Sequence, residues 1–266
     1  MQYLEQLILI TVCSLVFFAC QVEKHPTDPD YYIEWDETSL LRVAEEGGYP
    51  RLRRLNDGSL LVAYENRRGD VVVKRSTDEG YSWEEPITAY EKFEFIVPGS
   101  SASTVVNIAN PEFIQLANDD ILLACNLRPR VEGIYPFSIA LKRSSDNGKT
   151  WSDAKILYQA APLFKDGCWE PSFLILPDGE VQVYFANESP YRDSDEQEIS
   201  VLASTDNGFT WNENPSTVSF RRDHRDGMPV AVHDGTNVYV AIEDNFSGQF
   251  KPYIIRGRVS NPWSEA

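Results

Sequence analysis

Three copies of an eight-residue pattern, Ser-x-Asp-x-Gly-x-(Ser/Thr)-Trp, constrain the fold of this chain more than any other feature of its sequence. They occupy residues 76–83, 144–151 and 204–211, and their tryptophans are 68 and 60 residues apart. A degenerate fourth copy at 259–263 keeps only the Trp. In such a turn the Asp accepts backbone N–H bonds, and the Gly takes the positive φ of a tight hairpin. Recurrence at a regular period predicts a repeat architecture.

A second repeat runs in phase with the first. Proline recurs at Pro50, Pro111, Pro171 and Pro229, at intervals of 61, 60 and 58 residues. Each proline opens a strand, turn and strand, and a second strand pair with the Ser-x-Asp-x-Gly turn follows in the first three copies. Four strands per period are typical of a propeller blade. The sequence therefore predicts an all-β protein, a β-propeller of four-stranded antiparallel blades, of which about four are present.

Two other interpretations of the repeats are weaker. A run of β-sandwich domains would need turns that resemble one another by chance and stay in phase with the prolines. A calcium loop at residues 146–148 would need the further acidic positions of an EF-hand and its Glu at the twelfth position. Both are therefore disfavoured, and the propeller remains the prediction.

The N-terminus has the pattern of a targeting segment. Residues 7–20 are almost wholly apolar, too short for a transmembrane helix of about 20 residues but long enough for the core of a signal peptide. The stretch ends at Cys20, before a polar segment, and so resembles a bacterial lipoprotein signal with Cys20 as the lipidated residue. We expect a signal over 1–20, a linker over 21–36 and a propeller over 37–266. The alternative is a buried first helix.

Charge and composition exclude several classes of function. The net charge of −17 argues against nucleic acid, whose phosphates require neutralisation by Lys and Arg. It also leaves the lipid anchor as the only expected contact with a membrane. The three histidines have no metal-ligand spacing, so neither a metal nor another cofactor is expected. Cys125 and Cys168 fall on different predicted blades and are expected to be free, buried thiols. The chain is expected to be a monomeric cell-envelope protein of the periplasm or outer membrane.

The turn pattern resembles the Asp-box, or BNR, repeat of the sialidase superfamily, whose members are six-bladed propellers. The resemblance covers about residues 47–266. It implies that the first strand of each blade lines a central channel, and that the Asp-box turns lie on the outer rim, away from the active centre. Since about four of six blades are present, the propeller is expected to be incomplete at its C-terminal end.

Two glutamates are the candidates for catalysis. Glycoside hydrolysis needs two carboxyl groups on either side of one bond, roughly 5–9 Å apart. Glu170 directly precedes Pro171, and its neighbour Trp169 is expected to help bury it and raise its pKa. Glu243 ends a strand of the next blade. We therefore expect both glutamates near one mouth of the channel.

A closer resemblance supports this pair. The sequences Trp-Glu-Pro at 169–171 and Gly-Met-Pro-Val at 227–230, with Glu243 downstream, are similar to the exo-α-1,5-L-arabinanase family of six-bladed propellers. The opening Tyr-Pro-Arg-Leu at 49–52 also looks like that group. The resemblance implies a retaining hydrolysis carried by two glutamates. Which of them is the nucleophile stays open.

Other residues beside the repeated prolines and at the strand ends are candidates for substrate binding: Tyr49, Arg51, Asn110, Arg128, Trp169, Glu188 and Asp226. For the charged ones the alternative is a solvated or ion-paired strand end. Sialidases are a poorer match, because their first arginine precedes a proline, whereas here Pro50 precedes Arg51. They also require three arginines for the substrate carboxylate, of which Arg51 and Arg128 would supply two.

These observations predict an exported exo-glycosidase that cleaves terminal sugars from glycans, either arabinan-like or sialoside, by a two-carboxylate mechanism. Its partner is then a glycan or oligosaccharide substrate. The alternative is a propeller lipoprotein that binds glycans without cleaving them.

Overall fold

The structure is a computed structural model that describes residues 37–260 and residue 263. The chain divides into two compact units, residues 1–40 and 41–266. Of the first unit only the short 3-10 helix η1 (Glu37–Ser39) and Leu40 are described. The predicted signal, its Cys20 and the predicted linker all lie outside the described residues. No helix of the described part is long and apolar enough to cross a membrane.

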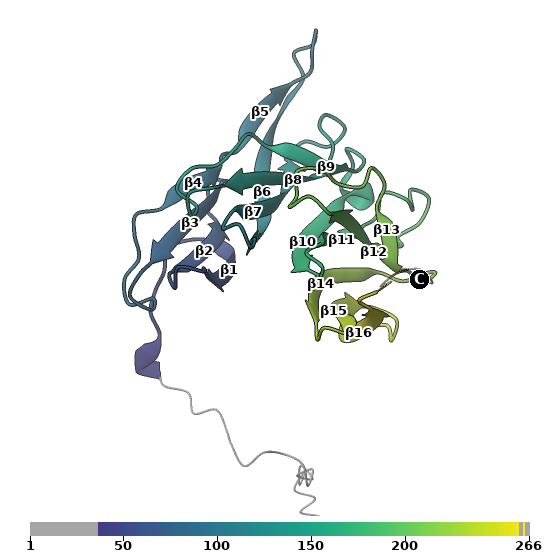
Figure 1. The fold of residues 1–266 in the computed structure, drawn as a ribbon. Helices are drawn as coiled ribbons and strands as arrows, with labels where there is room; N and C mark the ends of the chain where they lie inside the picture. Colours follow the sequence, from purple (N-terminus) through teal and green to yellow (C-terminus); the bar gives the residue numbers. More distant parts are fainter. Residues whose placement is uncertain (1–36, 261–262, 264–266) are drawn as a thin grey trace, which may run out of the picture. The chain divides into compact units, whose positions relative to one another are not determined.

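The second unit is all-β and forms four antiparallel sheets, which confirms the predicted propeller architecture (Figure 1). Sheet 1 holds β1 (Gly48–Arg54), β2 (Leu60–Glu65), β3 (Val71–Ser76) and β4 (Ile87–Tyr90). Sheet 2 holds β5 (Phe93–Ile96), β6 (Ser103–Gln115), β7 (Ile121–Pro129), β8 (Ser138–Ser144) and β9 (Lys155–Gln159). Sheet 3 holds β10 (Cys168–Ile175), β11 (Val181–Asn187), β12 (Glu198–Ser204) and β13 (Ser216–Ser219). Sheet 4 holds β14 (Asp226–His233), β15 (Asn237–Asp244) and β16 (Lys251–Arg258).

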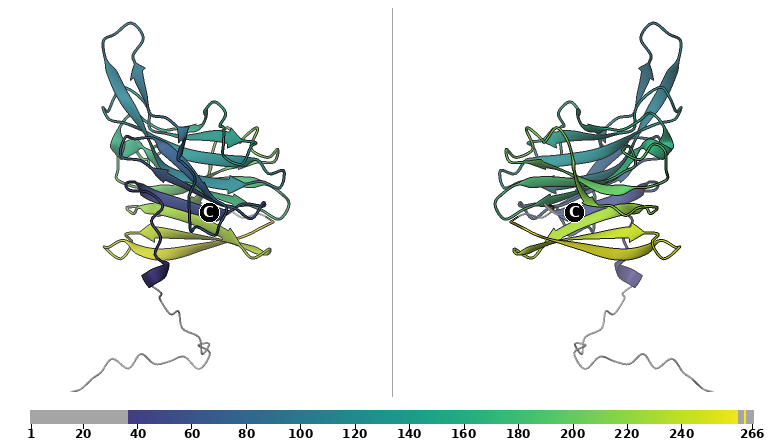
Figure 2. Two further views of the ribbon diagram at one scale, coloured as in Figure 1. Left: turned by 90° about the vertical axis from the view of Figure 1, so that its left-hand side faces the viewer. Right: turned by 90° about the vertical axis from the view of Figure 1, so that its right-hand side faces the viewer.

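Each sheet follows chain order from strand to strand, so every neighbouring pair is an antiparallel hairpin or a direct return. The innermost strands β1, β6, β10 and β14 come together, and β10 contacts both β6 and β14. Sheet 2 departs from the four-stranded blade. Its extra strand β5 pairs with the first residues of β6, and this hairpin projects beyond the other strands (Figure 2). A short 3-10 helix, η2 (Phe164–Asp166), leads into β10.

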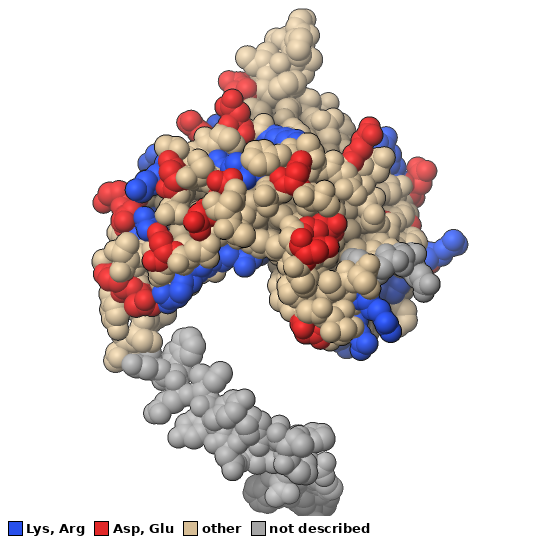
Figure 3. Space-filling model, in the orientation of Figure 1, with Lys and Arg blue, Asp and Glu red and all other residues tan. Residues whose placement is uncertain are grey.

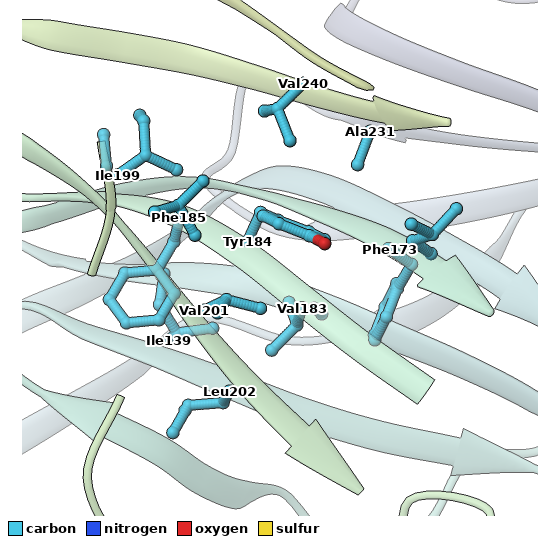
Figure 4. Close-up of a cluster of buried hydrophobic side chains, with 14 of the residues drawn as sticks. Ile139, Phe173, Val183, Tyr184, Phe185, Ile199, Val201, Leu202, Ala231 and Val240 are labelled. Atoms are coloured by element: carbon cyan, nitrogen blue, oxygen red, sulfur yellow. The ribbon is translucent and has the colours of Figure 1, made fainter. Parts of the chain in front are cut away.

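The core lies between successive sheets rather than inside any one of them. Every residue of β11 is buried, because sheet 3 packs against a neighbour on each face. In Figure 4, Tyr184 and Val183 of β11 lie among Ile139 of sheet 2 and Ala231 and Val240 of sheet 4. Burying one large aliphatic or aromatic side chain contributes about 1.5–3 kcal/mol. Sheet-to-sheet packing is therefore the main source of stability.

The Ser-x-Asp-x-Gly turns have the hydrogen bonds that their residues predict. In the second turn, Ser144 Oγ accepts the N–H of Gly148 at 2.8 Å, and Asp146 Oδ1 accepts the N–H of Thr150 at 2.8 Å. Trp151 donates its indole N–H to the carbonyl of Gly148 at 3.1 Å. The third turn repeats this pattern. In the first turn Trp83 differs, because its buried indole N–H has no hydrogen-bond partner among the described residues.

A β-bulge recurs in every innermost strand, near the start of β1, β10 and β14 and in the middle of β6. The residue directly before each repeated proline has a left-handed backbone: Tyr49 (φ 51°), Asn110 (φ 47°), Glu170 (φ 59°) and Met228 (φ 52°). The strand register shifts at each of these places. A left-handed conformation costs a non-glycine residue on the order of 1–3 kcal/mol, and the residue before proline normally adopts an extended conformation. A bulge re-aims its side chain, and here it does so at four equivalent positions.

Both cysteines of the described part are free and buried, as predicted, with Cys125 on β7 and Cys168 on β10. On the face drawn in Figure 3, acidic and basic side chains are interspersed.

The third turn predicts how stability depends on pH. The hydroxyl and backbone N–H of Thr210 and the hydroxyl of Ser204 lower the pKa of Asp206 to about 2. Because this folded pKa lies below the ordinary value of 3.8, the stabilisation is present above about pH 4 and is lost as the pH falls towards 2. We expect Asp206→Asn to lower the urea midpoint at pH 6, and the difference from the unmodified protein to shrink between pH 4 and 2. A constant difference across that range would contradict the assignment. The control is Asp193→Asn, at an exposed carboxylate outside the three Ser-x-Asp-x-Gly turns.

Candidate functional site

A pocket of about 240 Å³ lies beside the bulges of β6, β10 and β14, between sheets 2, 3 and 4. Six of its lining residues are those that the sequence singled out: Asn110, Arg128, Trp169, Glu170, Glu188 and Glu243. The others are Phe164, Gln197, Arg225, Gly227, Met228 and Phe250. Below, this is called the candidate pocket.

Glu170 is the half-buried carboxyl group of the candidate pocket. Its bulge in β10 brings it to β14, where its Oε2 accepts the backbone N–H of Met228 at 3.1 Å. Burial raises the pKa of Glu170; the Met228 N–H opposes this rise, and the negative charge of Glu243 adds to it. Arg128 and Arg51 lower the same pKa. Glu170 is therefore a carboxyl group with a raised pKa and a fixed orientation.

Glu243 is the second carboxyl group of the pocket. It lies near the end of β15, opposite Gly227 of β14, and its side chain is exposed. Its charge acts on the Glu170 carboxyl, so the two acids are electrostatic neighbours in one pocket. One carboxyl group is thus partly desolvated and hydrogen-bonded, and the other is open to solvent.

Trp169 supplies an aromatic wall. The indole is buried, and the exposed ring of Phe164 packs against it with centroids 4.8 Å apart. The Arg128 guanidinium lies 5.2 Å from the centroid of the Trp169 ring, a cation–π contact. The indole N–H donates to Glu188 Oε1 at 3.1 Å, which fixes the orientation of the ring.

Glu188 and Arg225, which both line the pocket, form an ion pair in which only the carboxylate is fully buried. Glu188 is 3% exposed and accepts a hydrogen bond from Arg225 Nη2. Arg225 also donates to Gln197 Oε1 at 2.9 Å and to the carbonyl of Asp195 at 2.8 Å. Burial raises the pKa of Glu188, and the Arg225 charge opposes the rise. Glu188 therefore already holds two groups of the protein, the Trp169 indole and Arg225.

Tyr49 and Arg51 of β1 are not among the residues that line the candidate pocket. Arg51 donates to Glu112 Oε2 at 2.7 Å, and Arg53 donates to Glu112 Oε1 at 2.6 Å. With Glu112, both arginines border a larger cavity of about 740 Å³ between the innermost strands. The Tyr49 ring lies 4.3 Å from the Arg51 guanidinium. Burial, with the charge of Glu170, raises the pKa of Tyr49 to about 12.

Asp226 is a third predicted binding residue that does not line the candidate pocket. It is fully buried. Its Oδ1 accepts a hydrogen bond from Arg221 Nη2 at 2.8 Å, and its Oδ2 accepts one from Ser219 Oγ. Burial raises its pKa, and the Ser219 hydroxyl and Arg221 oppose the rise. Asp226 thus supports the strand end beside the pocket.

Arg128 differs from the other arginines near the pocket. Arg51 is ion-paired with Glu112, and Arg225 is ion-paired with Glu188. Within the described part of the chain, Arg128 forms no ion pair with a carboxylate, and its recorded contact is with the Trp169 ring. The pocket therefore presents one guanidinium whose N–H groups are not committed to an acidic side chain. The described residues include no group of three or more His, Cys, Asp and Glu that could hold a metal ion.

Sequence reasoning missed Phe164, Gln197, Arg225 and Phe250 because none lies at the repeated proline or at the strand end that follows it. Arg225 reaches the pocket through an isolated parallel bridge to Gln197 just before β14. Phe164 belongs to η2, and Phe250 precedes β16. Of these four residues, only Arg225 could have been found from the sequence, because it directly precedes the predicted Asp226 and lies four residues before Pro229.

Several solved glycosidase structures superimpose on this chain. The GH93 alpha-L-arabinofuranosidase of Fusarium graminearum, in complex with arabinobiose, superimposes with a TM-score of 0.62 at 18% identity, covering 78% of this chain and 61% of that one. The alpha-L-arabinanase of Penicillium chrysogenum, also with arabinobiose, gives 0.61 at 21% identity, covering 79% and 62%. The NanB sialidase of Streptococcus pneumoniae gives 0.54 at 14% identity, covering 80% and 50%. This chain has the fold of the arabinanase and sialidase propellers.

The arabinanase-like and sialidase-like fold is the one that the sequence resemblance implied. At these identities the similarity concerns the fold alone. The chain spans about three fifths of the length of the two structures that hold arabinobiose. No protein-family model matches the sequence, and no curated protein matches it.

The Glu188–Arg225 pair yields a stability prediction. Arg225→Ala leaves a buried carboxylate without its counter-charge, so we expect the free energy of unfolding to fall by about 2–3 kcal/mol in urea titrations. Glu188→Gln added to Arg225→Ala removes the unpaired charge and should restore part of the loss. Strictly additive losses in this double-mutant cycle would contradict the pairing.

Proposed function

We propose that this chain is an exported glycoside hydrolase, an exo-glycosidase that releases terminal sugars from arabinan-like glycans, with Glu170 and Glu243 as its two reacting carboxyl groups. The observation that carries the proposal is that these acids line one pocket and the charge of Glu243 acts on the Glu170 carboxyl. Two carboxyl groups in one pocket are the minimal equipment of a glycosidase. The fold, shared with propellers that hold arabinobiose, supports the same class of chemistry.

In the proposed reaction, one glutamic acid donates its proton to the oxygen of the leaving sugar while the carboxylate of the other attacks the anomeric carbon. Water then cleaves the covalent glycosyl–enzyme bond, and the first residue takes up the proton of that water. Glu170 suits this chemistry because its carboxyl group is oriented by the Met228 N–H before substrate binds. Which acid attacks and which donates stays open.

The walls of the pocket suit a small neutral sugar. Trp169 and Phe164 offer apolar ring surface, and Arg128 and Asn110 offer polar groups at its edge. A sialoside requires three arginines around its carboxylate, as the sialidase resemblance implies. Here Arg51 and Arg225 are already paired with glutamates. The arabinan-like substrate is therefore the first candidate, and the sialoside the second.

Export completes the proposal. The apolar stretch at residues 7–20, which ends at Cys20, supports a lipoprotein signal. The mature protein would then act in the periplasm or at the outer membrane, anchored by lipid on Cys20.

The test is hydrolysis by the chain from residue 20 onward carrying Cys20→Ser. We expect release of arabinose from aryl α-L-arabinofuranosides or linear arabinan, and a loss of kcat/KM of about 10²–10⁴-fold in Glu170→Gln and in Glu243→Gln. Glu213→Gln, at an exposed carboxylate in the loop between β12 and β13, is the matched control and should keep full activity. Sugar binding without turnover by the folded protein would instead support a glycan-binding propeller. Release from a sialyl-aryl substrate alone would reverse the order of the two substrates.

A further inference from the structure

One repeat position joins two of the sheets to the sheet that follows them. It lies on the strand that follows the innermost strand of each sheet (β2, β7, β11 and β15), opposite the residue that directly precedes the bulge. Its four occupants, in chain order, are Glu65, Asn126, Ala186 and Glu243. Below, this is called the clasp position.

The first two occupants hold the bulge of the following sheet. Glu65 Oε1 accepts the backbone N–H of Asn110 at 2.7 Å, and Asn126 Oδ1 accepts the backbone N–H of Glu170 at 2.7 Å. Asn126 also donates from Nδ2 to the carbonyl of Cys168 at 2.6 Å. The fully buried Asn126 side chain thus binds main-chain groups on both sides of Trp169.

The third occupant breaks the pattern. Ala186 has no acceptor in its side chain, so the N–H of Met228 in the following sheet cannot be held in the same way. That N–H donates instead to Oε2 of Glu170. Because Ala186 offers no acceptor, this donor is left to the carboxylate of the candidate pocket.

We propose that Asn126 and Ala186 are positioning residues for Glu170. Asn126 holds the main chain of Glu170 in its left-handed conformation before Pro171, and Ala186 leaves the Met228 N–H as the group that orients the Glu170 carboxylate. Neither residue is among those that line the candidate pocket, so each acts through Glu170. The catalytic consequence rests on the proposed function, whereas the structural consequence does not.

The catalytic test compares variants of the full chain on an arabinan substrate. Asn126→Ala removes the bonds to the Glu170 N–H and the Cys168 carbonyl, and a longer one to the Ser138 carbonyl. We expect kcat to fall on the order of 10²-fold with little change in KM, since a misplacement of about 1 Å has this effect. Asn126→Asp keeps the acceptor for the Glu170 N–H and should lose less. Ala186→Asn supplies an acceptor that competes for the Met228 N–H and should also lower kcat.

The matched control is Ser204→Ala. Ser204 is buried in the same sheet as Glu170 and accepts the backbone N–H of Gly208 at 2.8 Å in the third Ser-x-Asp-x-Gly turn. Its loss should lower the urea midpoint without changing kcat. Wild-type kcat in folded Asn126→Ala and Ala186→Asn would overturn the proposal. If Asn126→Ala does not fold, Asn126→Asp and Ala186→Asn decide in its place.

A second readout needs no substrate. The carboxyl carbon of Glu170 is followed by NMR as a function of pH, and its signal is assigned by its absence in Glu170→Gln. The Met228 N–H favours the ionised carboxylate, so its diversion in Ala186→Asn should raise the titration midpoint of Glu170. Glu243, Arg128 and Arg51, the charged neighbours of this carboxyl, are unchanged in the variant. An unshifted midpoint would overturn the positioning role, whereas a shift in a protein without hydrolase activity would overturn only the proposed function.

Discussion

The left-handed turn before each repeated proline is the constraint on which the candidate site depends. At four equivalent places the chain leaves the regular strand, and each time it does so in a conformation that the residue before a proline normally avoids. Strain of this kind persists only where the surroundings hold it. Side chains of the preceding sheet do so at Asn110 and Glu170. Local strain is thereby coupled to the packing of one sheet on the next.

The same coupling organises the charges around the pocket. Glu112 of sheet 2 is bound by Arg51 and Arg53 of sheet 1, and Glu188 is bound by Arg225 at the start of sheet 4. These buried acids therefore link neighbouring sheets through ion pairs. Glu170 and Glu243 are different, because neither accepts a hydrogen bond from an arginine among the described residues. Glu112 and Glu188 are ion-paired because the fold places a guanidinium beside each of them, and Glu170 and Glu243 are left without such a partner in the described part of the chain.

The sequence was sufficient for much of the pocket. The repeated prolines marked the bulges, and the strand ends that follow them marked Arg128, Glu188 and Glu243, all of which line the pocket. The sequence was insufficient for pocket residues that lie outside the repeated strand pairs and for the direction of a buried side chain. Asp226 stands beside a repeated proline yet is buried against Arg221, whereas Phe164 and Phe250 arrive from irregular segments. Position in a repeat predicts where a main chain runs, but not which way a side chain points once its neighbours are placed.

The sequence by itself was enough to predict the propeller architecture. The turn pattern and the proline recur at a common period, and each specifies the local backbone of a blade without depending on contacts with distant residues. Tertiary structure alone decided which acids are free. Glu112, Glu188 and Glu170 all flank a proline or end a strand, and no spacing separates them. Their environments differ because Glu112 and Glu188 accept hydrogen bonds from arginines, whereas Glu170 accepts the backbone N–H of Met228. That N–H is available because the clasp position of the preceding sheet is an alanine. Those partners come from other sheets, and only the folded chain brings them within hydrogen-bonding distance.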